Sequence, residues 1–227
     1  MLTDQGAVKI VQVFLHYLET LPASVAQAKT AQASFEAYGL AVQPVKGYTA
    51  INYPKFKTMN KSFLSNFNTN KFHTKSACLA NHIRFWKEVH RLQETCIFAE
   101  HDALCVRPFR NLGYWDLCYL GAQAVVPKHN TFWRPFTLAL PGLNSIYDAA
   151  YKAPRYLNSN VYLDYKRLPN TVAYALTPSG AAKMLDALDS YGGEQAEFML
   201  NSFNLKISFW WPGIVDYQDN LNTSAGF

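Results

Sequence analysis

The stretch Cys96-Ile97-Phe98-Ala99-Glu100-His101-Asp102-Ala103-Leu104 decides the fold that we expect. Its first four residues are apolar, which is typical of a strand buried in a sheet. Two carboxylates, Glu100 and Asp102, then follow with His101 between them. Charges are costly inside an apolar layer unless they are paired or bound to a cation, and open α/β sheets bind ligands at their strand ends. We therefore predict a divalent metal here that binds a phosphate; the alternative is a polar turn that merely ends the strand.

The segments around this stretch predict alternating strands and helices. Strands are expected at residues 8–15, 40–45, 96–99, 117–120, 122–126, 171–176 and 206–211. Helices are expected at residues 24–38, 76–94, 178–188 and 194–204, with Ser24 and Thr177 as N-caps of the first and third. Residues 47–75, apart from a short helix near 61–67, and residues 142–160 are expected to be irregular. The strand–helix–strand opening favours an α/β fold with a mostly parallel central sheet, and the absence of repeats favours a single domain over residues 1–227.

Composition is that of a globular protein with a substantial core. The 227 residues are 49% hydrophobic and 15% aromatic. The four cysteines show neither a CxxC pair nor zinc-finger spacing, which indicates buried free thiols in a reducing compartment, with a single disulfide as the alternative. Neither a convincing signal peptide nor an apolar stretch of membrane-spanning length is present, so we expect a cytoplasmic protein with no membrane span.

Charge is distributed unevenly along the chain. The net charge is +5, and no acid occurs between Ala37 and Lys87. Lysines in this stretch alternate with aromatic residues, a pattern typical of a surface facing phosphates or nucleic acid. The alternative is a solvated loop held to the core by its aromatic side chains. His82, inside the predicted helix 76–94, is by itself more typical of a hydrogen-bonded core residue than of a ligand.

Five pieces of the chain, in order, resemble the family 25 glycosyltransferases, which include lipo-oligosaccharide and collagen galactosyltransferases. The matching pieces are Tyr38-Gly39-Leu40 through Gly47, Ala77-Cys78-Leu79-Ala80-Asn81-His82 with Trp86, Ile97 through Ala103, Ala173 through Ala181, and Trp211-Pro212-Gly213-Ile214-Val215 with Asn222-Thr223-Ser224. The resemblance implies a GT-A fold, that is, a single Rossmann-type α/β domain binding a nucleotide sugar such as UDP-glucose or UDP-galactose. It also implies Mn²⁺ or Mg²⁺ at the acidic strand end and inversion at the sugar carbon.

The resemblance also assigns roles to individual residues. Asp102 matches the last acid of the family's triplet and is the expected direct metal ligand. Glu100 matches the first acid and would assist or orient. His101 replaces the middle acid, which removes a negative charge, although a neutral histidine still ligates Mn²⁺.

Further donor contacts are predicted on the helix and the loop before this strand. Together with Glu100, His101 and Asp102, the residues expected to bind the nucleotide sugar are His82, Lys75 and Arg84. For the departing diphosphate, the sequence does not choose among Lys75, Arg84 and Arg134. The family's early Asp-Arg pair is missing, and Tyr17-Leu18-Glu19-Thr20 stands near its place.

Glu197 is the best match for the family's late acid, with Glu194 nearby, and either is a candidate general base toward the acceptor hydroxyl. The alternative for both is a solvated carboxylate favoured by the dipole at a helix start.

The resemblance thus predicts an enzyme, a hexosyl- or pentosyltransferase. Its acceptor is either a saccharide or, as the basic stretch suggests, a hydroxymethylated base in DNA of the kind found in phage genomes; a phage-encoded enzyme would act in the host cytoplasm. The alternative is a non-catalytic relative that binds nucleotide or nucleic acid, because His101 stands in place of an acid.

Overall fold

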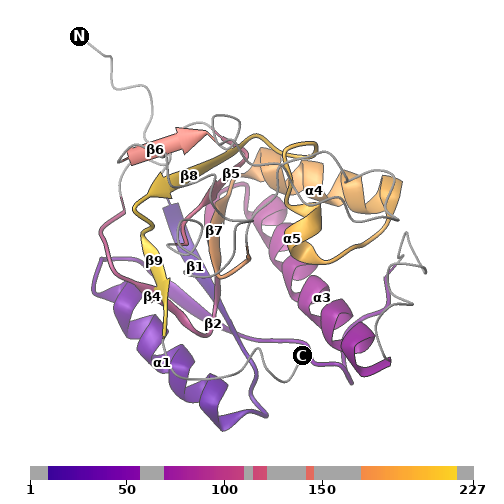
Figure 1. The fold of residues 1–227 in the computed structure, drawn as a ribbon, viewed down its shortest axis with the longest axis horizontal. Helices are drawn as coiled ribbons and strands as arrows, with labels where there is room; N and C mark the ends of the chain where they lie inside the picture. Colours follow the sequence, from indigo (N-terminus) through magenta and orange to yellow (C-terminus); the bar gives the residue numbers. More distant parts are fainter. Residues whose placement is uncertain (1–9, 57–68, 110–114, 122–141, 146–169, 219–227) are drawn as a thin grey trace, which may run out of the picture.

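The structure is a computed structural model, and it describes residues 10–56, 69–109, 115–121, 142–145 and 170–218 (Figure 1). The elements in chain order are β1 (Ile10–Tyr17), α1 (Pro22–Glu36), β2 (Val42–Lys46), α3 (Thr69–Leu92), β3 (Thr95–Glu100), β4 (Ala103–Cys105), β5 (Leu117–Tyr119), β6 (Gly142–Ser145), β7 (Ala173–Leu176), α4 (Pro178–Tyr191), α5 (Ala196–Met199), β8 (Ile207–Trp211) and β9 (Val215–Tyr217). No helix in these ranges is both long and apolar enough to cross a membrane.

The described strands form one large sheet and one small one. The large sheet has seven strands within the described ranges, in the order β2-β1-β3-β7-β5-β8-β6. Five of the seven point the same way, and only β7 and β6 run against them. The predicted α/β fold with a mostly parallel central sheet is therefore confirmed. The small sheet pairs β4 with β9, and β4 begins three residues after Glu100.

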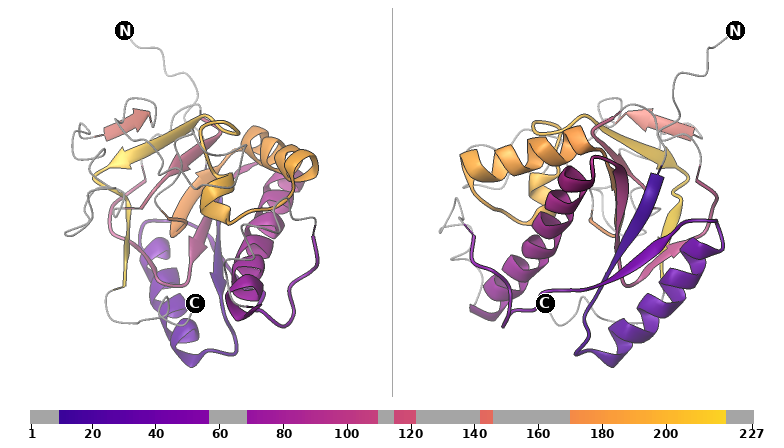
Figure 2. Two further views of the ribbon diagram at one scale, coloured as in Figure 1. Left: turned by 45° about the vertical axis from the view of Figure 1, so that its right-hand side comes forward. Right: turned by 180° about the vertical axis from the view of Figure 1, so that it is seen from behind.

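Helices cover the two faces of the large sheet. Figures 1 and 2 show α1 on one face and α3, α4 and α5 on the other. The buried apolar residues divide accordingly: one core lies under α1 and the other lies under α3, α4 and α5. The latter core contains a row of aromatic side chains that lie opposite one another on five neighbouring strands. These are Phe14, Phe98, Tyr174, Tyr119 and Phe209.

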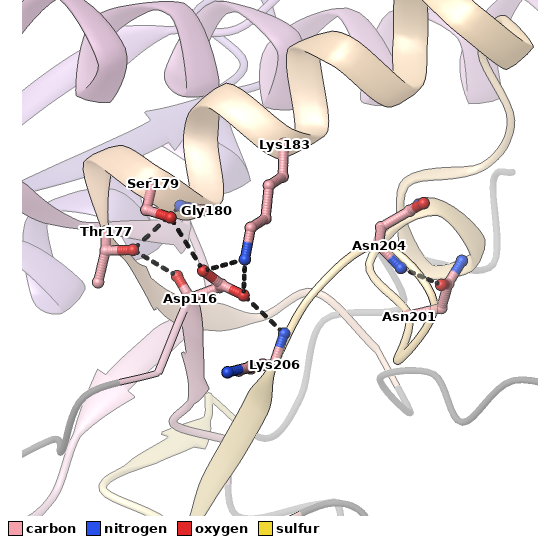
Figure 3. Close-up of polar contacts among 8 residues, drawn as sticks. All are labelled: Asp116, Thr177, Ser179, Gly180, Lys183, Asn201, Asn204 and Lys206. Carbon is pink, nitrogen blue, oxygen red and sulfur yellow. Dashed lines mark hydrogen bonds and ion pairs between the residues drawn. The ribbon is translucent and has the colours of Figure 1, made fainter.

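Asp116 joins the ends of three strands at the edge where β5 and β8 begin (Figure 3). Its carboxylate accepts hydrogen bonds from Lys183 Nζ at 2.7 and 2.8 Å, Ser179 Oγ at 3.2 Å and the Lys206 backbone N–H at 2.8 Å. Its carbonyl accepts bonds from the backbone N–H and the hydroxyl of Thr177. Because Glu100 ends a strand at the opposite edge, we interpret the Asp116 cluster as the structural anchor of α4.

The termini of two helices differ from the sequence prediction. Ser24 is not the N-cap of α1, which begins at Pro22; instead, Ser24 Oγ accepts a hydrogen bond from the Leu18 backbone N–H at 2.9 Å. The α3 helix begins at Thr69, seven residues before the predicted start, so the end of the expected irregular segment is helical. Thr177 is confirmed as the N-cap of α4, since its hydroxyl accepts the Gly180 N–H at 3.1 Å.

Two further predictions are corrected in the second half of the chain. The helix expected over 194–204 is only the short α5, because Asn201 Oδ1 accepts the backbone N–H groups of Phe203 and Asn204 and turns the chain. Residues 142–145, expected within a loop, form β6. The predicted short helix at 61–67, the strand at 122–126 and Arg134 lie outside the described residues. All four cysteines are free, as predicted.

Candidate functional site

The candidate site lies at the carboxyl ends of β1, β2 and β3. These strands are parallel, so their last residues meet at one edge of the sheet: His16 is paired in register with Glu100, and Tyr17 with Lys46. The chain turns after Glu100, and His101 and Asp102 form the turn that leads into β4. Ligands of open α/β sheets bind outside such an edge.

Glu100 is held by hydrogen bonds to the two residues that precede the neighbouring strand β7. Its backbone N–H donates to the Val172 carbonyl at 2.9 Å, and its Oε1 accepts a hydrogen bond from the Thr171 hydroxyl at 2.7 Å. Burial is the main cause that raises the pKa of Glu100, to about 7, and the charge of Asp102 adds to it. The Thr171 hydrogen bond opposes this shift, so the carboxyl is oriented but only partly stabilised in its ionised form.

Asp102 and His101 carry polar atoms without partners. Within the described residues, Asp102 Oδ1 and His101 Nε2 are buried and make no hydrogen bond. Burial raises the pKa of Asp102, with His101 opposing, and burial lowers the pKa of His101, with Asp102 opposing. Burial thus disfavours the ionised form of two neighbouring acids, and a bound cation would favour that form again.

The residue types at this turn fit a divalent cation. Carboxylate oxygens are the ligands that Mg²⁺ and Mn²⁺ prefer, Mn²⁺ accepts imidazole, and Asp102 offers a buried oxygen without a partner. Among the described residues, no group of three or more His, Cys, Asp or Glu side chains is already arranged to hold a metal ion. A catalytic magnesium site typically takes only one or two carboxylates and completes its shell with substrate phosphates and water. The three-ligand set Glu100, His101 and Asp102 stays a prediction.

Of the two candidate bases, Glu197 is the one brought to the acidic turn. It lies in the first turn of α5, and its charge is among the causes that raise the pKa of Glu100. Lys75 of α3 acts on Glu100 in the opposite sense and therefore also belongs to this neighbourhood. Burial raises the pKa of Tyr217, at the end of β9, and the charges of Glu100, Asp102 and Glu197 add to this shift.

Glu194, the other candidate base, has a different environment. It is 4% exposed, and neither of its carboxylate oxygens has a hydrogen-bond partner among the described residues. Burial raises its pKa to about 7, and the dipole of the adjacent Gln195 backbone N–H opposes the shift; no charged group among the described residues contributes. Glu194 is therefore a buried acid that stands apart from the acidic turn.

Arg84 lies beside the same sheet edge, on the side of β1 and β2. Its Nη2 donates to the Lys46 carbonyl at 2.7 Å and lies 3.4 Å from His16 Nδ1, and its guanidinium carbon is 4.5 Å from the centre of the Tyr48 ring. Asn81 fixes the same loop, because its Oδ1 accepts the Tyr48 N–H at 2.7 Å. Arg84 and Lys75 both belong to α3, and their contact with a donor stays a prediction.

His82 is a core residue in this structure. It is fully buried, its ring stacks on Phe98 with centroids 4.0 Å apart, and its Nδ1 is 2.9 Å from the Tyr174 hydroxyl. Burial lowers its pKa to about 3, so the ring is neutral. This position is that of the hydrogen-bonded core histidine described in the sequence analysis. Through its contact with Phe98, His82 also supports the strand that carries Glu100.

Three residues at this edge were missed by reasoning from sequence: His16, Thr171 and Gln218. His16 directly follows the strand predicted at residues 8–15, so the parallel pairing of this strand with the one before Glu100 was a usable signal. Thr171 reaches Glu100 because β7 runs antiparallel beside β3, a neighbour that the local pattern does not reveal. Gln218 follows the last strand, and no sequence signal that we recognise points to it.

Comparison with known proteins identifies the family of the chain. Curated protein sequences give no significant match. The family model described as glycosyltransferase family 25 (LPS biosynthesis protein) matches residues 15–199, a range that runs from the end of β1 through the acidic turn to the end of α5. The chain belongs to glycosyltransferase family 25.

Proposed function

We propose that this glycosyltransferase moves a sugar from a nucleotide-sugar donor to a hydroxyl acceptor, with a divalent cation held by Glu100 and Asp102. The observation that carries the proposal is the pair of acids with raised pKa values at the carboxyl edge of β1–β3, with Glu197 close enough to affect one of them. Membership of the family supports a nucleotide-sugar donor. The position of the two acids at the carboxyl ends of the strands supports this edge of the sheet as the donor's binding site.

In the proposed reaction, Glu197 acts as the general base. It accepts the proton of the acceptor hydroxyl as that oxygen forms a bond to the sugar's anomeric carbon. The bond from this carbon to the donor's diphosphate breaks on the opposite side, so the configuration is inverted and a nucleoside diphosphate leaves. A bound Mn²⁺ or Mg²⁺ would stabilise the negative charge on that leaving group. Thr171 holds the Glu100 carboxyl in place through the 2.7 Å hydrogen bond.

Cationic side chains of α3 support binding of the donor. Lys75 is already in the electrostatic neighbourhood of Glu100 and is placed to approach the diphosphate. Arg84 and the Tyr48 ring form a cation–aromatic pair beside β1 and β2, which suits the nucleoside part.

A saccharide hydroxyl is the acceptor that we favour, because the family is described by LPS biosynthesis. DNA as acceptor has less support. Within the described part of the basic stretch, Lys46 pairs with Glu19 at 2.6 Å on the surface, and Arg84 donates to the Lys46 carbonyl. Both cationic side chains therefore already have partners within the chain. Retention on duplex DNA that falls steeply with salt would restore the DNA hypothesis.

The test is release of nucleoside diphosphate from a panel of hexose and pentose donors, with Mn²⁺, with Mg²⁺ and with EDTA. We expect turnover that needs the cation and that Asp102→Asn reduces by roughly 100-fold or more. Turnover that is indifferent to EDTA and to Asp102→Asn would contradict the cation's role. Donor binding with no release under any condition would instead indicate the non-catalytic relative.

A further inference from the structure

The backbone of the acidic turn is anchored by the residue that follows β9. The antiparallel pairing of β4 with β9 places Tyr217 opposite Ala103, so Gln218 comes to lie opposite Asp102. The backbone N–H of Gln218 donates to the Asp102 carbonyl at 2.9 Å. Its side-chain Nε2 donates to the His101 carbonyl at 3.4 Å and to the Gln27 carbonyl of α1 at 2.9 Å.

These contacts join three parts of the chain that are distant in sequence. Gln218 connects the turn after β3 to α1, which covers the opposite sheet face from α3 (Figure 1). The partnerless atoms Asp102 Oδ1 and His101 Nε2 do not restrain the turn by hydrogen bonds. The turn's position therefore depends on its backbone contacts, two of which come from Gln218: its backbone N–H donates to the Asp102 carbonyl, and its side-chain amide donates to the His101 carbonyl and ties it to α1.

We propose that Gln218 is a positioning residue for the cation ligands of the acidic turn. The inference rests on the proposed function in one respect, namely that Asp102 binds a cation. Gln218 itself does not touch substrate in this proposal; it fixes the direction from which the Asp102 carboxylate leaves the backbone. Partners behind metal ligands typically change metal affinity by roughly 10- to 100-fold when they are removed.

The experiment measures Mn²⁺ binding to the full chain directly, from the free-Mn²⁺ electron paramagnetic resonance signal during titration, without any donor. Gln218→Met keeps the length of the side chain and the backbone N–H but removes the amide, and Gln218→Ala is the second variant. Gln32→Met is the matched control, because Gln32 also loses an amide hydrogen bond, to Glu36 at 2.8 Å, on the exposed face of α1. Melting temperature is measured for every variant.

We expect Gln218→Met and Gln218→Ala to raise the Kd for Mn²⁺ by roughly tenfold or more, with Gln32→Met unchanged and all variants folded at the assay temperature. An unchanged Kd in the folded Gln218 variants overturns the proposal. So does unfolding of both variants, which would make Gln218 a residue of the fold, and so does a wild type that binds no Mn²⁺.

These outcomes separate the inference from the proposed function. Cation-independent release of nucleoside diphosphate would leave glycosyl transfer standing while the role of Gln218 fails. Conversely, weakened Mn²⁺ binding in the Gln218 variants of a protein that turns over no donor would support Gln218 while the proposed reaction fails.

Discussion

Replacing Glu194 with glutamine is expected to stabilise the protein at neutral and alkaline pH, and much less in mild acid. In the folded state this carboxyl is 4% exposed and without a hydrogen-bond partner among the described residues, and its pKa is raised to about 7. The amide of Glu194→Gln is close in shape to the protonated carboxyl but cannot ionise. The variant therefore removes the cost of a buried charge and little else.

The sign and size follow from the two pKa values. An acid whose pKa is raised on folding does not destabilise the folded state at pH values well below its unfolded pKa of 4.5. Its destabilising effect grows as the pH rises and is complete above the folded pKa of about 7. Each pKa unit corresponds to about 1.4 kcal/mol, so the full cost is about 3 kcal/mol. At pH 5 the same calculation leaves about 1 kcal/mol.

Urea unfolding at pH 5 and at pH 8 measures this difference. The free energy of unfolding of Glu194→Gln should exceed that of the wild type by about 3 kcal/mol at pH 8 and by about 1 kcal/mol at pH 5. Glu94→Gln makes the same change at an exposed position and serves as the control. If Glu194→Gln and wild type differ by the same amount at both pH values, ionisation of a buried carboxyl is not the cause and the reasoning is wrong.

Three further variants test the site and the core. Glu197→Gln should lower kcat by roughly 100-fold or more, while Glu194→Gln keeps most of it; the reverse order would reassign the base. Gly180→Ala should lower the free energy of unfolding by about 1–3 kcal/mol in urea titrations, because its Cβ would lie 2.4 Å from a backbone carbonyl oxygen; wild-type stability would contradict this. Tyr174→Phe should cost about 1–3 kcal/mol in thermal unfolding, since the buried Trp86 Nε1 loses its acceptor at 3.0 Å; an unchanged melting temperature would argue against that hydrogen bond.

Local patterns predicted the elements that position the site. The apolar run before Glu100 is the buried strand β3, and the Thr177-Pro178 pair begins a helix as the capping chemistry requires. These predictions succeed because burial and capping act within a few residues of the sequence. The identity of the family also came from short pieces of sequence, each of which covers one element or two consecutive ones.

Tertiary neighbours could not be predicted in the same way. The insertion of antiparallel β7 between β3 and β5 is a pairing between distant segments, and it alone brings Thr171 to Glu100. The contact of Gln218 with the turn depends likewise on the pairing of β4 with β9. Helix lengths failed where a side chain competed for the backbone, as Asn201 does after α5.

Burial alone does not identify the functional acid in this chain. Glu100 and Glu194 both have a pKa raised to about 7, and burial is the largest cause for each. Within the described part of the chain, no charged group shifts the pKa of Glu194, whereas Asp102, Glu197 and Lys75 all affect that of Glu100, whose carboxyl is also oriented by a hydrogen bond. A cation and a diphosphate need several charges that converge on one place, and only the first of these two acids has them. The charged groups around an acid, more than the size of its pKa shift, are therefore the reason to propose the reaction at the end of β3.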